Sequence, residues 1–176
     1  MQKIGYHGTS HECAQKIKDS GFDINLSKEK GWLGKGIYFF QATGLTQGYS
    51  EACNYAKANK HIDKPEVLQA SIQCENKEEI VDLLENANDK RIFDECRNIA
   101  VEKYQTMNGN AKGFDDAFIF ALIDREHKPK IIRALIDAHR EKRYTSFVVR
   151  HPELIICVKD TKCIKDVEYA KENLHG

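Results

Sequence analysis

Residues 34–40 read GKGIYFF, in which two glycines flank a lysine and four apolar or aromatic residues follow. Glycines beside a lysine are typical of loops that hold a phosphate with backbone N–H groups. The phosphate-loop patterns do not fit, because Gly36 stands where a P-loop needs Ser or Thr, and Phe39 where a dinucleotide fingerprint needs glycine. We therefore expect these glycines to let the backbone come close to a buried strand.

His7, His11 and Cys13 also lie close together, and their side chains are of the types that bind metals. No second pair of ligands follows at the spacing of a metal site, so we predict no metal centre. The six cysteines form no C-x-x-C pair. We expect them to be reduced and mostly buried as small apolar residues.

The overall charge limits the class of partner. The chain has 176 residues, with 27 basic and 27 acidic side chains, so any nucleic-acid partner would have to meet a local basic surface. No apolar stretch approaches the roughly 20 residues that span a bilayer. The start, MQKIGYHGTS, has no hydrophobic signal segment. We expect a cytoplasmic protein with no membrane partner.

The elements that must position these residues are clearest in the first half of the chain. A helix is predicted over SHECAQKIKDSG, with Ser10 as its N-cap and Gly21 just past its end. A second helix is predicted over YSEACNYAKANK, and strands are predicted over KIGYHGT, GIYFF and VLQASIQC.

From residue 77 onward the pattern becomes mostly helical. Apolar residues at helical spacing predict one or two amphipathic helices in 77–107, before a loop at NGNAKG. FDDAFIFALI fits either a helix or a strand. KPKIIRALIDAHREK predicts a helix with Ile131, Ile132, Leu135 and Ile136 on one stripe, and KDVEYAKENL predicts a final helix. Between them, SFVVR and ELIICVK predict strands. The whole, 1–176, is predicted to be one α+β domain with a helical insertion at roughly 77–143.

Three ordered motifs, YHGT, GWLGKGIYFF and ACNYA, resemble those of NAD-dependent ADP-ribosyltransferases of the histidine–tyrosine–glutamate class. That class includes the poly(ADP-ribose) polymerase catalytic domain and the diphtheria-toxin-like enzymes. The resemblance covers residues 4–74 and 146–164 and leaves the segment between them unmatched. It implies a pair of small antiparallel sheets around an NAD cleft, with NAD as co-substrate and no metal.

The resemblance also assigns roles to residues. It implies that His7 holds the adenosine ribose and that the Gly8 backbone pairs with the nicotinamide amide, which needs a close approach of the chain. Tyr38 and Tyr55 would sandwich the nicotinamide ring, since stacked aromatics suit a flat cation. The structural alternatives are a histidine at a strand end, core packing of Tyr38 and packing of Tyr55 against the sheet.

Three further positions complete the implied cofactor-binding set: Thr9, Gly36 and Ser50. The family often has a serine three residues before its second tyrosine, where it binds the amide. Here Ala52 occupies that position, so the contact is either lost or supplied by Ser50.

The class glutamate should come late, at the start of an apolar strand, and Glu153 in RHPELIICVKD fits that place. A carboxylate that binds the ribose 2′-hydroxyl and faces the charge left by departing nicotinamide would lower the barrier. The alternatives are a solvated residue at a strand end, or Glu168 or Glu172 as the catalytic carboxylate.

A basic segment bears on the acceptor. Residues 125–144 hold seven Arg or Lys against three acids, and on the predicted helix Lys130, Arg133 and Arg140 share a face. This face could grip phosphates, or it could be solvated.

The function that the resemblance implies is a mono-ADP-ribosyltransferase acting on a macromolecule, with RNA or another nucleic acid favoured over protein. It would be a toxin or anti-phage effector, with a neutralising antitoxin as partner. The alternatives are a non-catalytic NAD or ADP-ribose binding module and an NAD-dependent RNA 2′-phosphotransferase.

Overall fold

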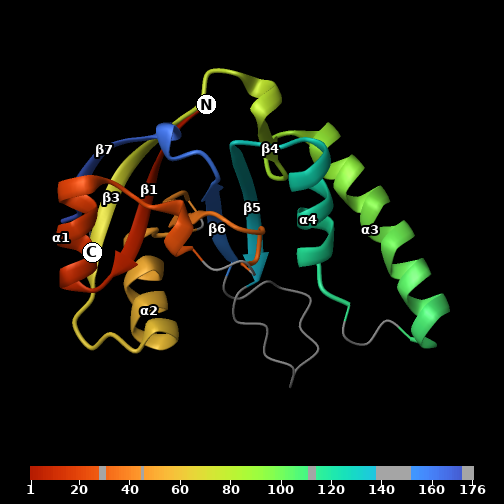
Figure 1. Cartoon of the computed structure of the whole chain (residues 1–176), viewed down its shortest axis with the longest axis horizontal. Helices are drawn as coiled ribbons and strands as arrows, with labels where there is room; N and C mark the ends of the chain where they lie inside the picture. The colour runs from red at the N-terminus through yellow and green to blue at the C-terminus, as the bar shows by residue number, and fades with distance from the viewer. Residues whose placement is uncertain (28–30, 45, 111–113, 138–151, 172–176) are drawn as a thin grey trace.

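The computed structural model describes residues 1–27, 31–44, 46–110, 114–137 and 152–171 (Figure 1). Its strands are β1 (Gln2–Thr9), β2 (Ile37–Phe40), β3 (Glu66–Gln73), β4 (Ile80–Asp82), β5 (Ile131–Asp137), β6 (Pro152–Val158) and β7 (Ile164–Tyr169). Its helices are α1 (His11–Ser20), α2 (Tyr49–Lys60), α3 (Ala87–Asn108) and α4 (Ala117–Glu126), with short 3-10 turns at Ile24–Leu26, Lys77–Glu79 and Thr161–Cys163. The predicted α+β class is confirmed.

The strands form a single sheet in the order β4-β5-β6-β2-β1-β3-β7. Strands β1 and β3 pair along the whole length of β1, but β1 and β2 pair only through Tyr6 and Phe40. Strand β4 runs parallel to β5, and the other neighbours are antiparallel. The expectation of a pair of small antiparallel sheets was therefore wrong, because the strands form one mixed sheet. One half of the sheet is β4-β5-β6-β2 and the other is β1-β3-β7, and the two halves pair only through Tyr6 and Phe40. Strand β4 adds a parallel edge to the first half.

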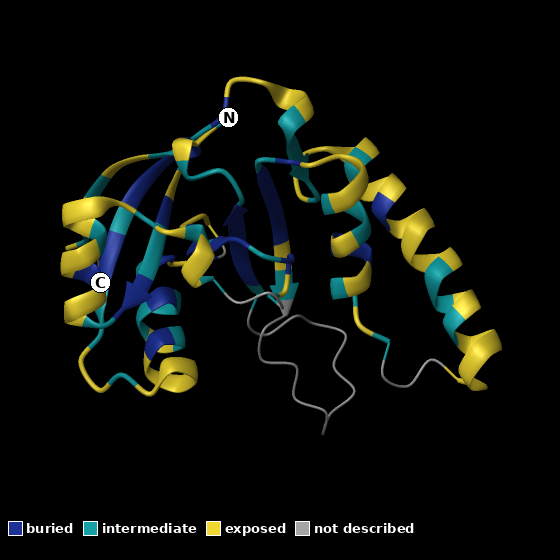
Figure 2. Ribbon diagram, viewed as in Figure 1, coloured by how far each residue is buried: buried dark blue, intermediate teal, exposed yellow. Residues whose placement is uncertain are grey.

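Each half of the sheet has its own covering helices. Helices α1 and α2 lie beside β1 and β3, whereas α3 and α4 lie beyond β5 (Figure 1). Alternate residues of β2 and β6 point to opposite faces, so Phe40 and Ile155 join a core with α2, α3 and α4, while Phe39 and Ile156 join a second core. Strands β5 and β6 are mostly buried (Figure 2).

The local signals of the first half predicted their elements correctly. Ser10 Oγ accepts a hydrogen bond from the Cys13 N–H at 3.2 Å, which caps α1. Gly21 ends that helix at φ 81°, where its N–H donates to Ile17 O at 2.8 Å. Helix α2 covers the predicted segment, and β2 and β3 lie where their sequences indicated.

The segment from residue 77 is less helical than predicted. Its first residues form a 3-10 turn and β4, and one helix, α3, follows from Ala87. FDDAFIFALI, which the pattern left open, includes the first part of helix α4. Because β4 and β5 both fall within 77–143, the prediction of a helical insertion was wrong in part.

Two predicted helices are strands. Ile131–Asp137 forms β5 between β4 and β6, and its residues Ile131, Ile132 and Ala134 are buried. A strand covered on both faces shows no alternation, so its apolar run cannot be distinguished from a helical stripe by spacing. In the last segment, Ile164–Tyr169 pairs with β3 as β7, so Glu168 is in a strand. SFVVR, Arg140 and Glu172 lie outside the described residues.

Among the described residues, none of the helices has the length and the apolar character that crossing a bilayer requires.

Candidate functional site

His7 links the two halves of the sheet beyond the point where β1 and β2 stop pairing. Its Nδ1–H donates to the Tyr38 carbonyl at 2.8 Å, a carbonyl that lies past the single β1–β2 residue pair. The imidazole packs against Phe22 and Phe39, with ring centroids 5.3 and 5.8 Å away. A side-chain hydrogen bond thus satisfies a main-chain acceptor at the junction.

His7 is neutral at physiological pH. Burial and then the charge of Lys60 lower its pKa to about 4, and the hydrogen bond to Tyr38 O only partly opposes them. Because Nδ1 carries the proton, Nε2 is the acceptor nitrogen of the ring. A hydroxyl group, such as that of a ribose, is the kind of donor that Nε2 suits.

Gly8 lies where α2 packs against β1. A Cβ on Gly8 would lie 2.0 Å from the carbonyl oxygen of the fully buried Ala52, so no side chain fits. The Gly8 carbonyl accepts a hydrogen bond from Lys60 Nζ at 2.9 Å. The packing of α2 against β1 therefore explains why residue 8 is a glycine. Lys60 is already hydrogen-bonded to the Gly8 backbone, with which the resemblance pairs the nicotinamide amide.

An aromatic group lies on the α2 side of β2. The Trp32 ring is edge-on to Tyr38 and Tyr55, at centroid distances of 6.2 and 5.4 Å. Tyr55 also contacts Phe40 at 5.7 Å. The structure therefore brings the two predicted tyrosines together through Trp32, a residue that the sequence analysis assigned no role.

The Tyr38 hydroxyl is engaged in the turn before its strand. It accepts from the Leu33 N–H at 2.8 Å and donates to the Gly34 carbonyl at 2.5 Å. Burial and the neighbouring Cys157 thiol raise the pKa of Tyr38, so the phenol stays protonated. Its ring is the part that could face a ligand.

Glu153 is buried near Tyr55. It lies near the start of β6 opposite Ile136 and is only 6% exposed, so a solvated residue at a strand end is excluded. The pKa of Tyr55 is raised, first by burial and then by the Glu153 charge. A carboxylate and an aromatic ring that are distant in sequence are therefore neighbours in the fold.

The other predicted site residues are less clearly tied to this group. Thr9 is buried at the end of β1, and Ser50 is partly buried in the first turn of α2. Gly36 has no room for a side chain, since a Cβ would lie 2.4 Å from Cys157 Sγ. His11 contacts Glu66 Oε1 at 3.1 Å. Within the described part of the chain, no three His, Cys, Asp or Glu residues gather as metal ligands would.

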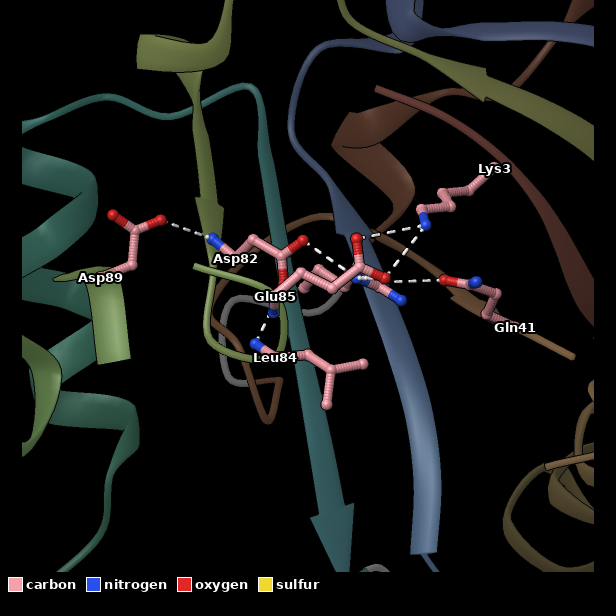
Figure 3. A network of polar contacts seen from close by, with 7 residues as sticks. Lys3, Gln41, Asp82, Leu84, Glu85 and Asp89 are labelled. Atoms are coloured by element: carbon pink, nitrogen blue, oxygen red, sulfur yellow. Dashed lines mark hydrogen bonds and ion pairs between the residues drawn. The ribbon is translucent and has the colours of Figure 1, made fainter. Parts of the chain in front are cut away.

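The predicted basic helix face is wrong. Arg133 is 1% exposed, and it donates to Gln41 Oε1 and to Asp82 Oδ2, both at 2.9 Å. It also pairs with Glu85, which in turn contacts Lys3 (Figure 3). Lys130, outside that network, pairs with Glu79. Arg133 cannot serve as a phosphate contact, because it is buried in an ion-pair network.

Sequence reasoning missed three residues with contacts at this site: Trp32, Lys60, and Lys159, whose Nζ donates to the carbonyls of Leu33 and Lys35 in the turn before β2. Trp32 is part of the motif GWLGKGIYFF. Its side chain is 39% exposed and lies beside two tyrosines, an arrangement that suggests binding only once the fold is known. Lysines at the ends of a helix and a strand carry no comparable sequence signal.

Comparison with models of protein families, with curated proteins and with solved structures found no match to this chain in any of the three.

Proposed function

We propose that this protein is an NAD-dependent ADP-ribosyltransferase that cleaves NAD and transfers ADP-ribose to a macromolecular acceptor. The observation that carries the proposal is the buried Glu153, whose charge, after burial, raises the pKa of Tyr55, a member of the aromatic group that also includes Trp32 and Tyr38. An acidic side chain kept in such surroundings suits the stabilisation of a developing positive charge.

The proposed chemistry uses these side chains as follows. The aromatic rings would bind the cationic nicotinamide ring of NAD. His7 Nε2 would accept a hydrogen bond from a ribose hydroxyl, since Nδ1 is already the donor to Tyr38. The bond from ribose C1′ to the nicotinamide nitrogen breaks, and its electron pair leaves with neutral nicotinamide. Glu153 would stabilise the oxocarbenium-like ribose while the acceptor atom bonds to C1′ and loses its proton.

Lys60 constrains this proposal at one point. Its ammonium group donates to the Gly8 carbonyl. For the nicotinamide amide to use that carbonyl, Lys60 must turn away. Lys60 is an exposed residue at the last position of α2, so only a flexible side chain has to move.

For the acceptor we propose nucleic acid first, RNA in particular, because residues 125–144 carry six Arg or Lys besides Arg133, against three acids. Arg133 is excluded from that role by its burial. Protein is the other acceptor class that the same assay distinguishes. We further propose a toxin or anti-phage effector that a neutralising antitoxin restrains.

The test is incubation of the pure protein with NAD labelled on the adenylate phosphate and with total cell extract. We expect label in a macromolecule, and nuclease or protease treatment then identifies its class. Glu153→Gln should lower transfer by on the order of 100–1000-fold while NAD still binds. Glu102→Gln, at an exposed position on α3, is the matched control.

Three outcomes would count against the proposal. Turnover of Glu153→Gln within a few-fold of the parent would remove Glu153 from the mechanism. NAD binding without NAD cleavage would favour a non-catalytic binding module. Loss of a 2′-phosphate from RNA, with ADP-ribose moved onto that phosphate, would favour the RNA 2′-phosphotransferase.

A further inference from the structure

The turn formed by residues 31–36 carries Trp32 and is held from two sides. On one side the Tyr38 hydroxyl bonds Leu33 N and Gly34 O, as described above. Within the turn, the Gly34 N–H donates to Gly31 O at 3.1 Å. Gly31 also has no space for a side chain, since a Cβ would lie 2.2 Å from the Tyr38 hydroxyl oxygen. The turn and the Tyr38 ring are therefore packed as one unit.

On the other side the turn is held by Lys159, the residue directly after β6. Its Nζ donates to Leu33 O at 3.1 Å and to Lys35 O at 2.9 Å. The same ammonium group forms an ion pair with Asp124 Oδ2 of α4 at 2.8 Å. The Lys159 side chain is 11% exposed, so a mostly buried cation is satisfied by two carbonyls and one carboxylate.

The Asp124 carboxylate also lies where a side chain on Gly34 would be. A Cβ on Gly34 would lie 2.7 Å from Asp124 Oδ2 and 3.0 Å from Lys159 Nζ, and Gly34 has φ 82°. Glycine is required there both by the backbone conformation and by this close approach. Helix α4, from the segment that the family motifs do not cover, is thus in contact with the turn beside the proposed NAD site.

We propose that Lys159 and Asp124 are positioning residues, which hold turn 31–36 so that the Trp32 ring lies against both Tyr38 and Tyr55. This inference rests on the proposed NAD function for its catalytic consequence, but the positioning itself does not depend on that function. Helix α4 contributes through Asp124, whose carboxylate holds the Lys159 ammonium group toward the Leu33 and Lys35 carbonyls.

The positioning is tested first by fluorescence. Trp32 is the single tryptophan of the chain, so emission excited at wavelengths that tryptophan absorbs and the seven tyrosines do not reports on this turn alone. We expect Lys159→Met to shift the emission to longer wavelength and to increase quenching by acrylamide. Asp124→Asn, which keeps the shape of the side chain, should give a smaller change in the same direction. Lys103→Met, at an exposed position on α3, is the matched control and should leave the emission unchanged.

The consequence for the reaction is tested by NAD kinetics on the same variants. A misplaced aromatic wall should lower kcat/KM for NAD by about 10- to 100-fold in Lys159→Met, mainly through a higher KM. In the Lys159→Met/Asp124→Asn double variant, the second change should add little, because the two residues act through one contact.

The outcomes separate the two proposals. If the parent neither binds nor cleaves NAD, the proposed function fails, and Trp32 quenching alone decides the positioning. Unchanged Trp32 emission in folded Lys159→Met and Asp124→Asn would overturn the positioning. The positioning would also be overturned if the effects of the two substitutions were additive in the double variant. If Lys159→Met does not fold, Asp124→Asn alone decides between these results.

Discussion

At the scale of the residue, His7 shows how the fold sets a protonation state. Its Nδ1–H is committed to Tyr38 O, and burial and then the nearby Lys60 charge oppose a second proton by lowering the pKa. A histidine that ordinarily titrates near neutrality is therefore held neutral and in one tautomer. The stability of the protein should therefore depend on pH, whether or not the protein binds NAD.

We predict that His7 makes the protein less stable in mild acid. Its folded pKa of about 4 lies below the reference value of 6.5, so the unfolded chain binds more protons between these values. The stability is fully present above about pH 6.5 and is lost as pH falls toward 4. At pH 5 the loss from this group is up to about 2 kcal/mol.

The measurement is urea unfolding of the parent and of His7→Gln at pH 7 and pH 5. Both proteins share every other titrating group, so the difference between their pH dependences isolates His7. Identical pH dependences would show that the histidine is not held neutral by the fold.

A second prediction at this scale concerns Gly8. Gly8→Ala should destabilise the protein by at least about 2 kcal/mol, because the new methyl group would overlap the Ala52 carbonyl and push α2 from β1. Gly44→Ala is the control, since a Cβ there meets nothing within 4 Å. Thermal melts of the two variants should differ clearly, and equal melting temperatures would contradict the close packing.

At the scale of the element, β5 depends on a buried arginine. Arg133 joins β5 to Gln41, just past β2, and to Asp82 at the end of β4, so it connects three parts of the fold (Figure 3). Asp82 also accepts hydrogen bonds from the N–H groups of Leu84 and Glu85, which shapes the turn leading to α3. The network fixes the parallel edge of the sheet and the start of the helical segment together.

We predict that Arg133→Met lowers the free energy of unfolding by about 3 kcal/mol, because it leaves the mostly buried Asp82 carboxylate without its arginine partner. Glu85→Gln should cost less than about 1 kcal/mol, since the Glu85 side chain is 56% exposed and its ion pairs are largely screened. Chemical denaturation measures both. Similar losses for the two variants would mean that burial does not set the cost.

At the scale of the whole molecule, the proposed role predicts a phenotype. Expression of the parent chain alone should arrest bacterial growth, because NAD is abundant and the proposed enzyme would act without restraint. Glu153→Gln, expressed at the same level, should be tolerated. Growth curves with matched protein levels test this. Harmless expression of a parent chain with transfer activity confirmed in extract would contradict the toxin role and leave the chemistry standing.

The sequence by itself determined the elements whose signals are local. Ser10 and Gly21 marked both ends of α1, and the aromatic and β-branched run of GIYFF indicated β2. The sequence also indicated the candidate site residues, whose roles stay predictions. These features depend on neighbours in the chain, so a short stretch of residues contains the information.

Only the tertiary structure decided which strands were covered on both faces and which charges were buried. The sheet neighbours of β5 come from residues 80–82 and 152–158, and Arg133 finds Asp82 at a sequence separation of 51 residues. After burial, the charge of Glu153 raises the pKa of Tyr55, and Lys159 contacts a turn 124 residues earlier in the chain. Such contacts depend on strand pairing across the whole chain. The spacing of residues therefore wrongly predicted a helix at β5, and it wrongly placed the buried Arg133 on a basic surface.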